Sequence, residues 1–300
     1  MQSRREFIGL TGALMAGSLT SFASPLDVKN APGYQLLMMA TNWGFPGSAA
    51  EFCKKAKQAG YDGIEVWFPT DSKAREELMA AVKENGLQTA FLYGGSDKDP
   101  QKHFVQFKEA LEAAVLVKPL YFNSHSGRDF YSFEENKRFI DLTIEVSRAT
   151  QIPIYHETHR SRSLYSAPVA KQFMEKTPEL RLTFDVSHWC NVHESLLDDQ
   201  PETLSLTISR TDHIHARIGH PEGPQVNDPR APEWKKAVDA HVGWWDRIVE
   251  TKKKEGKRMT ILTEFGPPDY MPTLPYTRQP MSNQWEINVY MMEMLRERYR

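Results

Sequence analysis

Eight short apolar runs alternate with longer amphipathic stretches along most of this 300-residue chain. Each run has the length of a buried β-strand, and the stretches between them have the composition of helices. Strands that alternate with helices form a parallel sheet, because each helix returns the chain to the same end of the sheet. The expected strands span residues 35–41, 63–69, 88–93, 119–124, 152–157, 181–185, 212–216 and 259–264.

Capping signals support helices between these strands. The expected caps are Ser48 and Gly60 for the first helix, Ser72 and Gly86 for the second, and a Ser132 and Glu135 capping box for the fourth. Eight strand-helix units predict an α/β protein with a single (β/α)8 TIM barrel at residues 35–300. The alternative is a doubly wound open sheet, which more often has a Gly-rich phosphate loop after its first strand. Residues 41–47 (TNWGFPG) are too aromatic for such a loop.

The N-terminus has the pattern of an export signal. Arg4 and Arg5 precede an uncharged stretch at residues 8–19, and residues 21–23 (SFA) form a small-x-small cleavage pattern. The stretch is too short for a membrane span, and no cysteine follows it to carry a lipid anchor. The arginine pair resembles the twin-arginine signals of bacteria, which implies recognition by export machinery and a periplasmic location. We therefore expect a signal peptide at residues 1–23 and a linker at 24–34, with no stable membrane anchor.

Composition argues against two classes of protein. The chain has 37 basic and 39 acidic residues, and this balance lacks the basic surface that nucleic-acid binding requires. The only two cysteines, Cys53 and Cys190, lie far apart in the sequence. We expect two buried free thiols rather than a disulfide scaffold, since a core of this size needs no covalent support.

Polar residues stand at the ends of the last four expected strands. These residues are Glu157, Asp185, His215 and Glu264. In a barrel the C-terminal ends of all strands meet on one face, where three buried carboxylates would repel one another without a cation. Each residue alone is more often a helix cap or an ion-pair partner, but four in succession predict one divalent metal site. The ligand set suits Mn²⁺, Mg²⁺ or Co²⁺, and Zn²⁺ is possible.

Several motifs together resemble the xylose isomerase-like barrel superfamily, which includes the sugar phosphate isomerases and epimerases. They are Gly60-Tyr61-Asp62-Gly63-Ile64-Glu65, Asp185-x-x-His188, the His213-Ile214-His215 run and Glu264. The resemblance implies that Glu157, Asp185, His215 and Glu264 are the metal ligands and that His188 contacts substrate. We assign His215 rather than His213 because it lies nearer the end of its strand, which leaves His213 as a supporting residue.

The resemblance also implies a reaction. A bound ion would stabilise the enediolate that forms when a proton leaves the carbon next to a carbonyl, and Glu157 and Glu264 would act as the bases. One position departs from the ketose 3-epimerases, because their substrate-binding arginine lies six residues beyond the metal histidine, where this chain has Pro221. Arg217 lies two residues beyond His215 instead. We expect Arg217 to bind the sugar in a different way.

Three alternatives to an isomerase or epimerase remain. The same enediolate could expel a leaving group, which would make the protein a lyase that cleaves 3-keto-glycosides by β-elimination. The barrel could instead be a non-catalytic exported carbohydrate-binding protein, although such a protein needs no pair of bases. The apurinic endonuclease branch fits worse, because it needs further metal ligands and the only downstream Asp-x-His, at residues 239–241, falls in a helical pattern.

Other residues are candidates for the substrate pocket. His125 and His159 follow the fourth and fifth expected strands and could bind sugar hydroxyls, although loop histidines are as often solvated. Trp43 follows the first strand and could stack on a sugar face, although packing is the commoner role of a single tryptophan. Residues 219–229 are rich in Pro and Gly, and we expect either a loop over the pocket or a plain connector.

Overall fold

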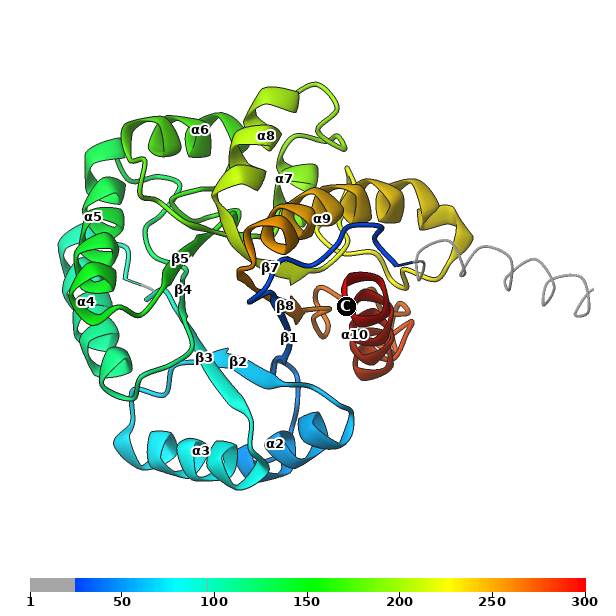
Figure 1. The fold of residues 1–300 in the computed structure, drawn as a ribbon, viewed down its shortest axis with the longest axis horizontal. Coiled ribbons are helices and arrows are strands. Elements are labelled where there is room, and N and C mark those ends of the chain that lie inside the picture. Colours follow the sequence, from blue (N-terminus) through cyan, green and yellow to red (C-terminus); the bar gives the residue numbers. More distant parts are fainter. Residues whose placement is uncertain (1–24, 96) are drawn as a thin grey trace, which may run out of the picture.

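The computed structural model describes residues 25–95 and 97–300. It is a closed barrel of eight parallel strands in chain order, with β8 paired to β1 (Figure 1). The strands are β1 (Gln35–Ala40), β2 (Gly63–Trp67), β3 (Gln88–Tyr93), β4 (Phe122–Ser124), β5 (Ile154–Glu157), β6 (Leu182–Phe184), β7 (Thr211–Ala216) and β8 (Arg258–Thr263). The expected (β/α)8 fold is confirmed, and the open-sheet alternative is wrong. The expected signal peptide lies outside the described residues and stays a prediction.

Helices surround the barrel in Figure 1 and return the chain from each strand to the next. They are α2 (Ala49–Gln58), α3 (Ser72–Asn85), α4 (Pro100–Leu116), α5 (Phe133–Thr150), α6 (Ala167–Lys176), α7 (Ser187–Val192), α8 (Pro201–Arg210), the 3₁₀ turn η1 (Pro232–Trp234), α9 (Lys235–Glu255) and α10 (Gln284–Tyr299). Within the described residues, none of these helices combines the length and the apolar character needed to cross a membrane.

The capping residues explain where the helices begin and end. Ser48 and Ser132 each form a capping box, in which the serine side chain accepts from the backbone of a glutamate that in turn accepts from the serine backbone. The expected cap at Ser72 is wrong by one residue, because Asp71 accepts from the backbone N–H of Ala74 and Ser72 begins the helix. Gly86 ends α3 with φ 60°, a left-handed conformation that glycine adopts without steric penalty.

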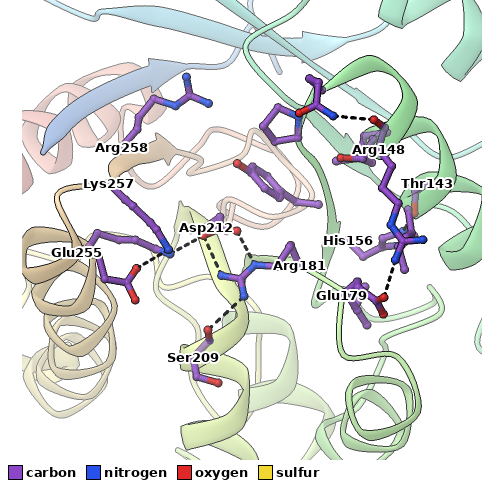
Figure 2. Close-up of a pocket in the computed structure, with 18 of the residues that line it drawn as sticks. Thr143, Arg148, His156, Glu179, Arg181, Ser209, Asp212, Glu255, Lys257 and Arg258 are labelled. Atoms are coloured by element: carbon purple, nitrogen blue, oxygen red, sulfur yellow. Dashed lines mark hydrogen bonds and ion pairs between the residues drawn. The ribbon is translucent and has the colours of Figure 1, made fainter. Parts of the chain in front are cut away.

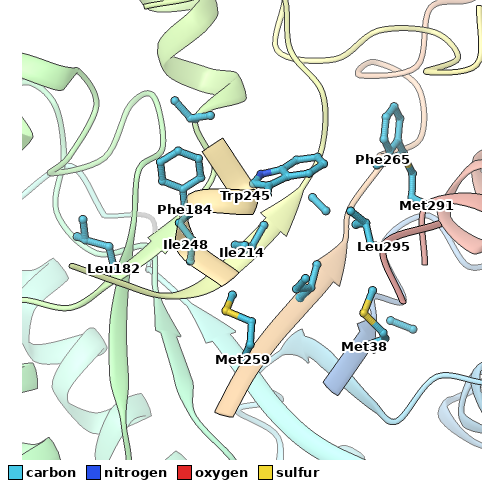
Figure 3. Packing of buried hydrophobic residues seen from close by; sticks show 14 of the residues in the cluster. Met38, Leu182, Phe184, Ile214, Trp245, Ile248, Met259, Phe265, Met291 and Leu295 are labelled. Carbon is cyan, nitrogen blue, oxygen red and sulfur yellow. The ribbon is translucent and has the colours of Figure 1, made fainter. Parts of the chain in front are cut away.

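The core has two parts because successive strand residues face opposite sides of the barrel wall. The larger part joins outward-facing strand residues such as Met38 and Ile214 to helix residues such as Ile248 and Leu295 (Figure 3). The smaller part fills the barrel interior with Leu37, Met39, Ala90, Tyr121, Tyr155 and Leu262. Cys53 and Cys190 are both buried free thiols, as the sequence predicts.

A buried histidine on α9 gives the fold a predictable response to acid. The Nδ1–H of His241 donates to the Ala237 carbonyl at 2.8 Å, and its Nε2 accepts from the Gly219 N–H at 3.2 Å, which requires the neutral ring. Burial lowers the pKa of His241 to about 4, despite the hydrogen bond to Ala237. The unfolded chain takes up this proton near pH 6.5, so the free energy of unfolding should fall as the pH drops from 6.5 towards 4.

The expected loss from His241 is about 2 kcal/mol between pH 7 and pH 5, measured by urea unfolding. In the variant His241→Gln the amide can make both bonds without titrating. The variant should therefore lose less stability than the wild type over this interval. Equal losses in the two proteins would show that His241 does not contribute to the acid sensitivity.

Candidate functional site

The structure brings together the four residues at the ends of β5 to β8. Glu157, Asp185, His215 and Glu264 are buried, and each offers a ligand atom that lies within 4.8 Å of the others. Glu157 ends β5, Asp185 follows β6, His215 lies near the end of β7 and Glu264 follows β8. Residues separated by more than 100 positions in the sequence therefore meet because parallel strands end on one face. We call these four residues the carboxylate-histidine cluster.

The imidazole of His215 is held in one orientation by a residue beneath it. Its Nε2–H donates to Glu65 Oε1 at 3.0 Å. This leaves Nδ1 facing the cluster, 3.3 Å from Glu157 Oε2 and 3.0 Å from Glu264 Oε2. A carboxylate that accepts from one imidazole nitrogen so that the other can bind a metal is a common arrangement in metalloproteins.

Glu65 on β2 contacts the residues of the site, although its sequence motif predicted no role for it. Its Oε2 accepts from the Tyr121 hydroxyl at 2.7 Å and lies 2.9 Å from His213 Nε2, while Oε1 also accepts from Asn123 at 3.2 Å. Burial would raise the pKa of Glu65, but the histidines at 213 and 215 hold it below the usual range. The signal available in the sequence was a charged residue inside an apolar strand. His213 lies beneath the cluster, where the sequence analysis expected a supporting residue.

The donor set fits a cation. Three buried atoms of the cluster have no hydrogen-bond partner among the described residues: Glu157 Oε1, His215 Nδ1 and Glu264 Oε2. A buried acceptor without a hydrogen bond lowers the stability of the fold, and a divalent ion bound by all three atoms would compensate for the missing bonds. Asp185 differs, because its Oδ1 accepts from the backbone and hydroxyl of Ser187 and its Oδ2 accepts from Arg217. Asp185 would therefore bind the ion through an oxygen that also accepts a hydrogen bond.

The electrostatics of the cluster also show an excess of negative charge. Burial raises the pKa of Asp185 to about 6, although Arg217 opposes the effect. Burial would lower the pKa of His215, but Glu264 and Glu157 raise it well above its ordinary value. The neighbouring carboxylates thus favour positive charge at the position of His215, which is what a bound cation would supply.

A cavity of about 240 Å³ opens beside the cluster. Glu264 and Arg217 line it, and so do three of the candidates from the sequence, His125, His159 and Trp43. The cavity is small for a ligand site in a protein, which suits a monosaccharide-sized compound. The side chains expected at the substrate pocket are therefore present, with the exception of His188.

His188 is buried and is not among the described side chains that line the cavity. Its Nε2 accepts from Arg217 Nη2 at 2.8 Å, and its ring centroid lies 3.8 Å from that of His159. Arg217 also contacts Asp185 and lies 3.4 Å from Glu264 Oε2. In this structure His188 supports Arg217, and a direct contact with substrate would require a rearrangement.

Two aromatic side chains, Trp43 and Tyr270, line the cavity together with Glu264. Trp43 meets Tyr270 edge to face with centroids 4.9 Å apart, and the Arg217 guanidinium lies 4.8 Å from the Tyr270 ring. Tyr270 comes from the long segment between β8 and α10, and nothing in the local sequence pattern marked it. Such rings provide flat apolar faces on which a sugar can stack.

Residues 219–229 form a connector rather than a cover for the pocket. None of the side chains that line the cavity comes from this segment. Gln225 accepts from the Gly266 N–H at 2.7 Å and donates to the Gly266 carbonyl at 3.2 Å, which anchors the segment against the end of β8. Of the two expectations for this segment, the loop over the pocket is wrong.

A second cavity, of about 680 Å³, lies at the opposite end of the barrel (Figure 2). Its lysine, arginine, aspartate and glutamate side chains other than Arg258 are paired with one another, and Arg258 donates to the Leu120 carbonyl at 3.4 Å. Arg181 binds Asp212 at 2.6 and 2.9 Å, Lys252 binds Asp212 at 2.5 Å, and Arg148 binds Glu179 at 2.6 Å. The N-terminal ends of barrel strands commonly serve stability, and we assign no chemistry to this larger cavity.

The barrel and the cluster at its C-terminal face define a class of α/β protein with a buried group of carboxylates and a histidine that could hold a cation. The family model described as "Xylose isomerase-like TIM barrel" matches residues 53–242. The chain belongs to this family, as the motifs in the sequence predict. No curated protein sequence matches the chain significantly.

Solved structures resemble this fold at low sequence identity. A probable 3-DHS dehydratase from Bacillus anthracis has a TM-score of 0.58 at 15% identity, with 87% of this chain and 98% of that chain covered. A 3-keto-D-glucoside 4-epimerase from E. coli has a TM-score of 0.58 at 16% identity, with 87% and 99% covered. A sugar phosphate isomerase/epimerase from Parabacteroides distasonis has a TM-score of 0.55 at 11% identity, with 86% and 97% covered. These similarities establish the fold alone.

Proposed function

We propose that this protein is a divalent-metal-dependent isomerase or epimerase that moves a proton on the carbon next to the carbonyl of a keto-sugar. The observation that carries the proposal is the convergence of three carboxylates and an imidazole within 4.8 Å, beside a cavity of sugar size. A divalent ion bound by the cluster would polarise the substrate carbonyl and stabilise negative charge on the adjacent oxygens. Mn²⁺, Mg²⁺ and Co²⁺ suit the donors best, and Zn²⁺ is a fourth candidate.

We assign the proton transfer to two carboxylates. Glu264 lines the cavity, so it can reach the C–H bond of a bound sugar directly. Glu157 lies behind His125, whose Nε2 contacts Glu157 Oε2 and whose ring lines the cavity. We assign Glu264 as one base and Glu157, directly or through His125, as the second group that returns the proton. Arg217 and the ring of Trp43 would orient the sugar between them.

The second candidate function is a lyase for 3-keto-glycosides. Loss of a leaving group from the β carbon needs the same proton abstraction, and a resembling structure is that of a probable dehydratase, an enzyme that eliminates water. Incubation of the metal-loaded protein with a free ketose and with a 3-keto-glucoside separates the reactions. An epimer or isomer supports the first, and released aglycone supports the second.

A non-catalytic carbohydrate-binding protein is disfavoured, because a binding site needs no buried bases beside it. Tight sugar binding with no solvent-deuterium exchange under any of the four cations would support it instead.

We further propose that the protein acts in the periplasm after export. This rests on the arginine pair and apolar stretch at residues 1–23. Detection of the mature protein in the periplasmic fraction, and its loss when Arg4 and Arg5 are both changed to Lys, would test this location.

Glu65→Gln should weaken metal binding by about 10- to 100-fold, because the amide can donate to His215 Nε2 and so favour the wrong imidazole tautomer. Isothermal titration of the metal-free protein with Mn²⁺ measures the effect. Tyr121→Phe is the matched control, since it removes one hydrogen bond to the same carboxylate and leaves the contact with His215. An unchanged dissociation constant in Glu65→Gln would exclude this positioning role.

A further inference from the structure

One guanidinium that lines the cavity beside the carboxylate-histidine cluster has no anionic partner among the residues that the structure describes. Arg162 lies in the segment after β5 and lines the cavity together with Glu264 and His159. Its Nε is buried without an acceptor, and among the described residues its side chain forms no ion pair or hydrogen bond. A guanidinium that is partly removed from water without a partner is costly to the free protein.

Two neighbouring arginines, unlike Arg162, have partners within the protein. Arg217 pairs with Asp185, and Arg160 donates to Asn191 Oδ1 at 3.2 Å and lies 5.3 Å from the Tyr270 ring. Both therefore have partners within the protein. Of the two arginines that line this cavity in the described part of the chain, Arg162 is the one whose side chain has no partner within the protein.

No carboxylate of the described residues forms an ion pair with Arg162. Glu157 Oε2 is engaged by His125 and by Asn123 Nδ2, the latter at 2.8 Å, and Glu157 Oε1 is one of the atoms assigned to the ion. Burial lowers the pKa of Arg162, and the positive charge of Arg128 adds to this effect while Glu157 opposes it. The position therefore disfavours a lone positive charge, and an arriving anion would relieve the conflict.

We propose that the substrate carries a carboxylate that pairs with Arg162, so that the substrate class is an acidic keto-sugar. The reaction in this inference rests on the proposed function, and the negative charge of the substrate rests on Arg162. A guanidinium presents two parallel N–H donors that match the two oxygens of a carboxylate. A phosphate monoester carries about 1.5 to 2 negative charges. The second guanidinium that lines the cavity, Arg217, is already neutralised by Asp185, so one unit of negative charge is the better match.

Matched pairs of compounds test the inference. D-fructuronate and D-tagaturonate differ from D-fructose and D-tagatose in having a carboxylate in place of a terminal hydroxymethyl group. With the Mn²⁺-loaded full chain, we expect at least one acid to bind more than 10-fold more tightly than its neutral partner. Titration calorimetry gives the affinity, and solvent-deuterium exchange followed by NMR gives kcat/KM.

Arg162→Met should weaken the affinity for the acid by about 10²-fold and leave the neutral sugar within about twofold. Arg162→Lys should recover part of the loss, since it restores the charge without the forked donors. Arg160→Met is the matched control, because Arg160 lies two positions away and has partners within the protein. The melting temperature of free Arg162→Met should be unchanged or higher, since an unpaired charge is removed.

The outcomes separate this inference from the proposed function. Acid binding that depends on Arg162 without any deuterium exchange would support the carboxylate site and contradict the proposed reaction. Deuterium exchange with equal efficiency on acid and neutral sugars, or an equal loss for both in Arg162→Met, would support the reaction and overturn the carboxylate site. Failure of both acids to bind would also overturn it.

Discussion

Glu264→Gln is expected to slow solvent-deuterium exchange into the substrate by about 10²- to 10⁴-fold, the range for loss of a general base. Glu264 lines the cavity, and with Oε2 assigned to the ion its other oxygen, Oε1, is left to accept the proton. The amide has the same shape and keeps one oxygen for the ion, but it cannot accept a proton. Proton NMR of the substrate in D₂O measures the rate at saturating Mn²⁺.

Two controls make this result specific to the base. Glu145→Gln changes the same residue type at an exposed position of α5 and should leave exchange unaltered. Metal content measured on Glu264→Gln shows whether the variant still holds its ion. A variant that retains the ion and exchanges at the wild-type rate would remove Glu264 from the proton transfer.

Removal of the divalent ion is expected to abolish exchange and to destabilise the fold. The carboxylates of the cluster are buried, so loss of the cation leaves their repulsion uncompensated. An ion present at about 1,000 times its dissociation constant adds about 4 kcal/mol to the free energy of unfolding. The melting temperature should therefore fall on chelation and recover, together with exchange, when one equivalent of Mn²⁺ is returned.

His215→Ala provides the control for this experiment. Without its imidazole, which lies 3.0 Å from Glu264 Oε2, the variant should respond little to chelator or to Mn²⁺. Activity and a melting temperature that persist in excess chelator in the wild type would contradict a metal-dependent enzyme.

The fold could be predicted because its signals are local. Apolar runs with helix caps between them mark each strand, and the observed strand ends differ from the expected ones by at most three residues, the largest difference being the start of β4 at Phe122 rather than 119. The expectation that Glu157, Asp185, His215 and Glu264 meet followed from one rule, the convergence of parallel strand ends. The choice of Ser72 as a cap failed because Asp71 caps equally well, and the pattern does not distinguish neighbouring capping residues.

The rest of the site depends on contacts that no local pattern reveals. Glu65 and Asn123 matter because the barrel interior places them under His215, about 90 or more positions away in the chain. Tyr270 reaches the cavity along a loop whose path is set by tertiary packing. Arg162 is notable only because no residue in the described part of the chain pairs with it, and the absence of a partner can be recognised only in three dimensions.

One divalent ion is expected to bind to Glu157, Asp185, His215 and Glu264. Anomalous diffraction from crystals of the Mn²⁺-loaded protein tests this most directly. We predict a single strong peak, about 2.0 to 2.4 Å from the carboxylate oxygens and from His215 Nδ1. The absence of a peak there, or a peak held instead by Glu65 and His213 or by His125 and His159, would contradict the account.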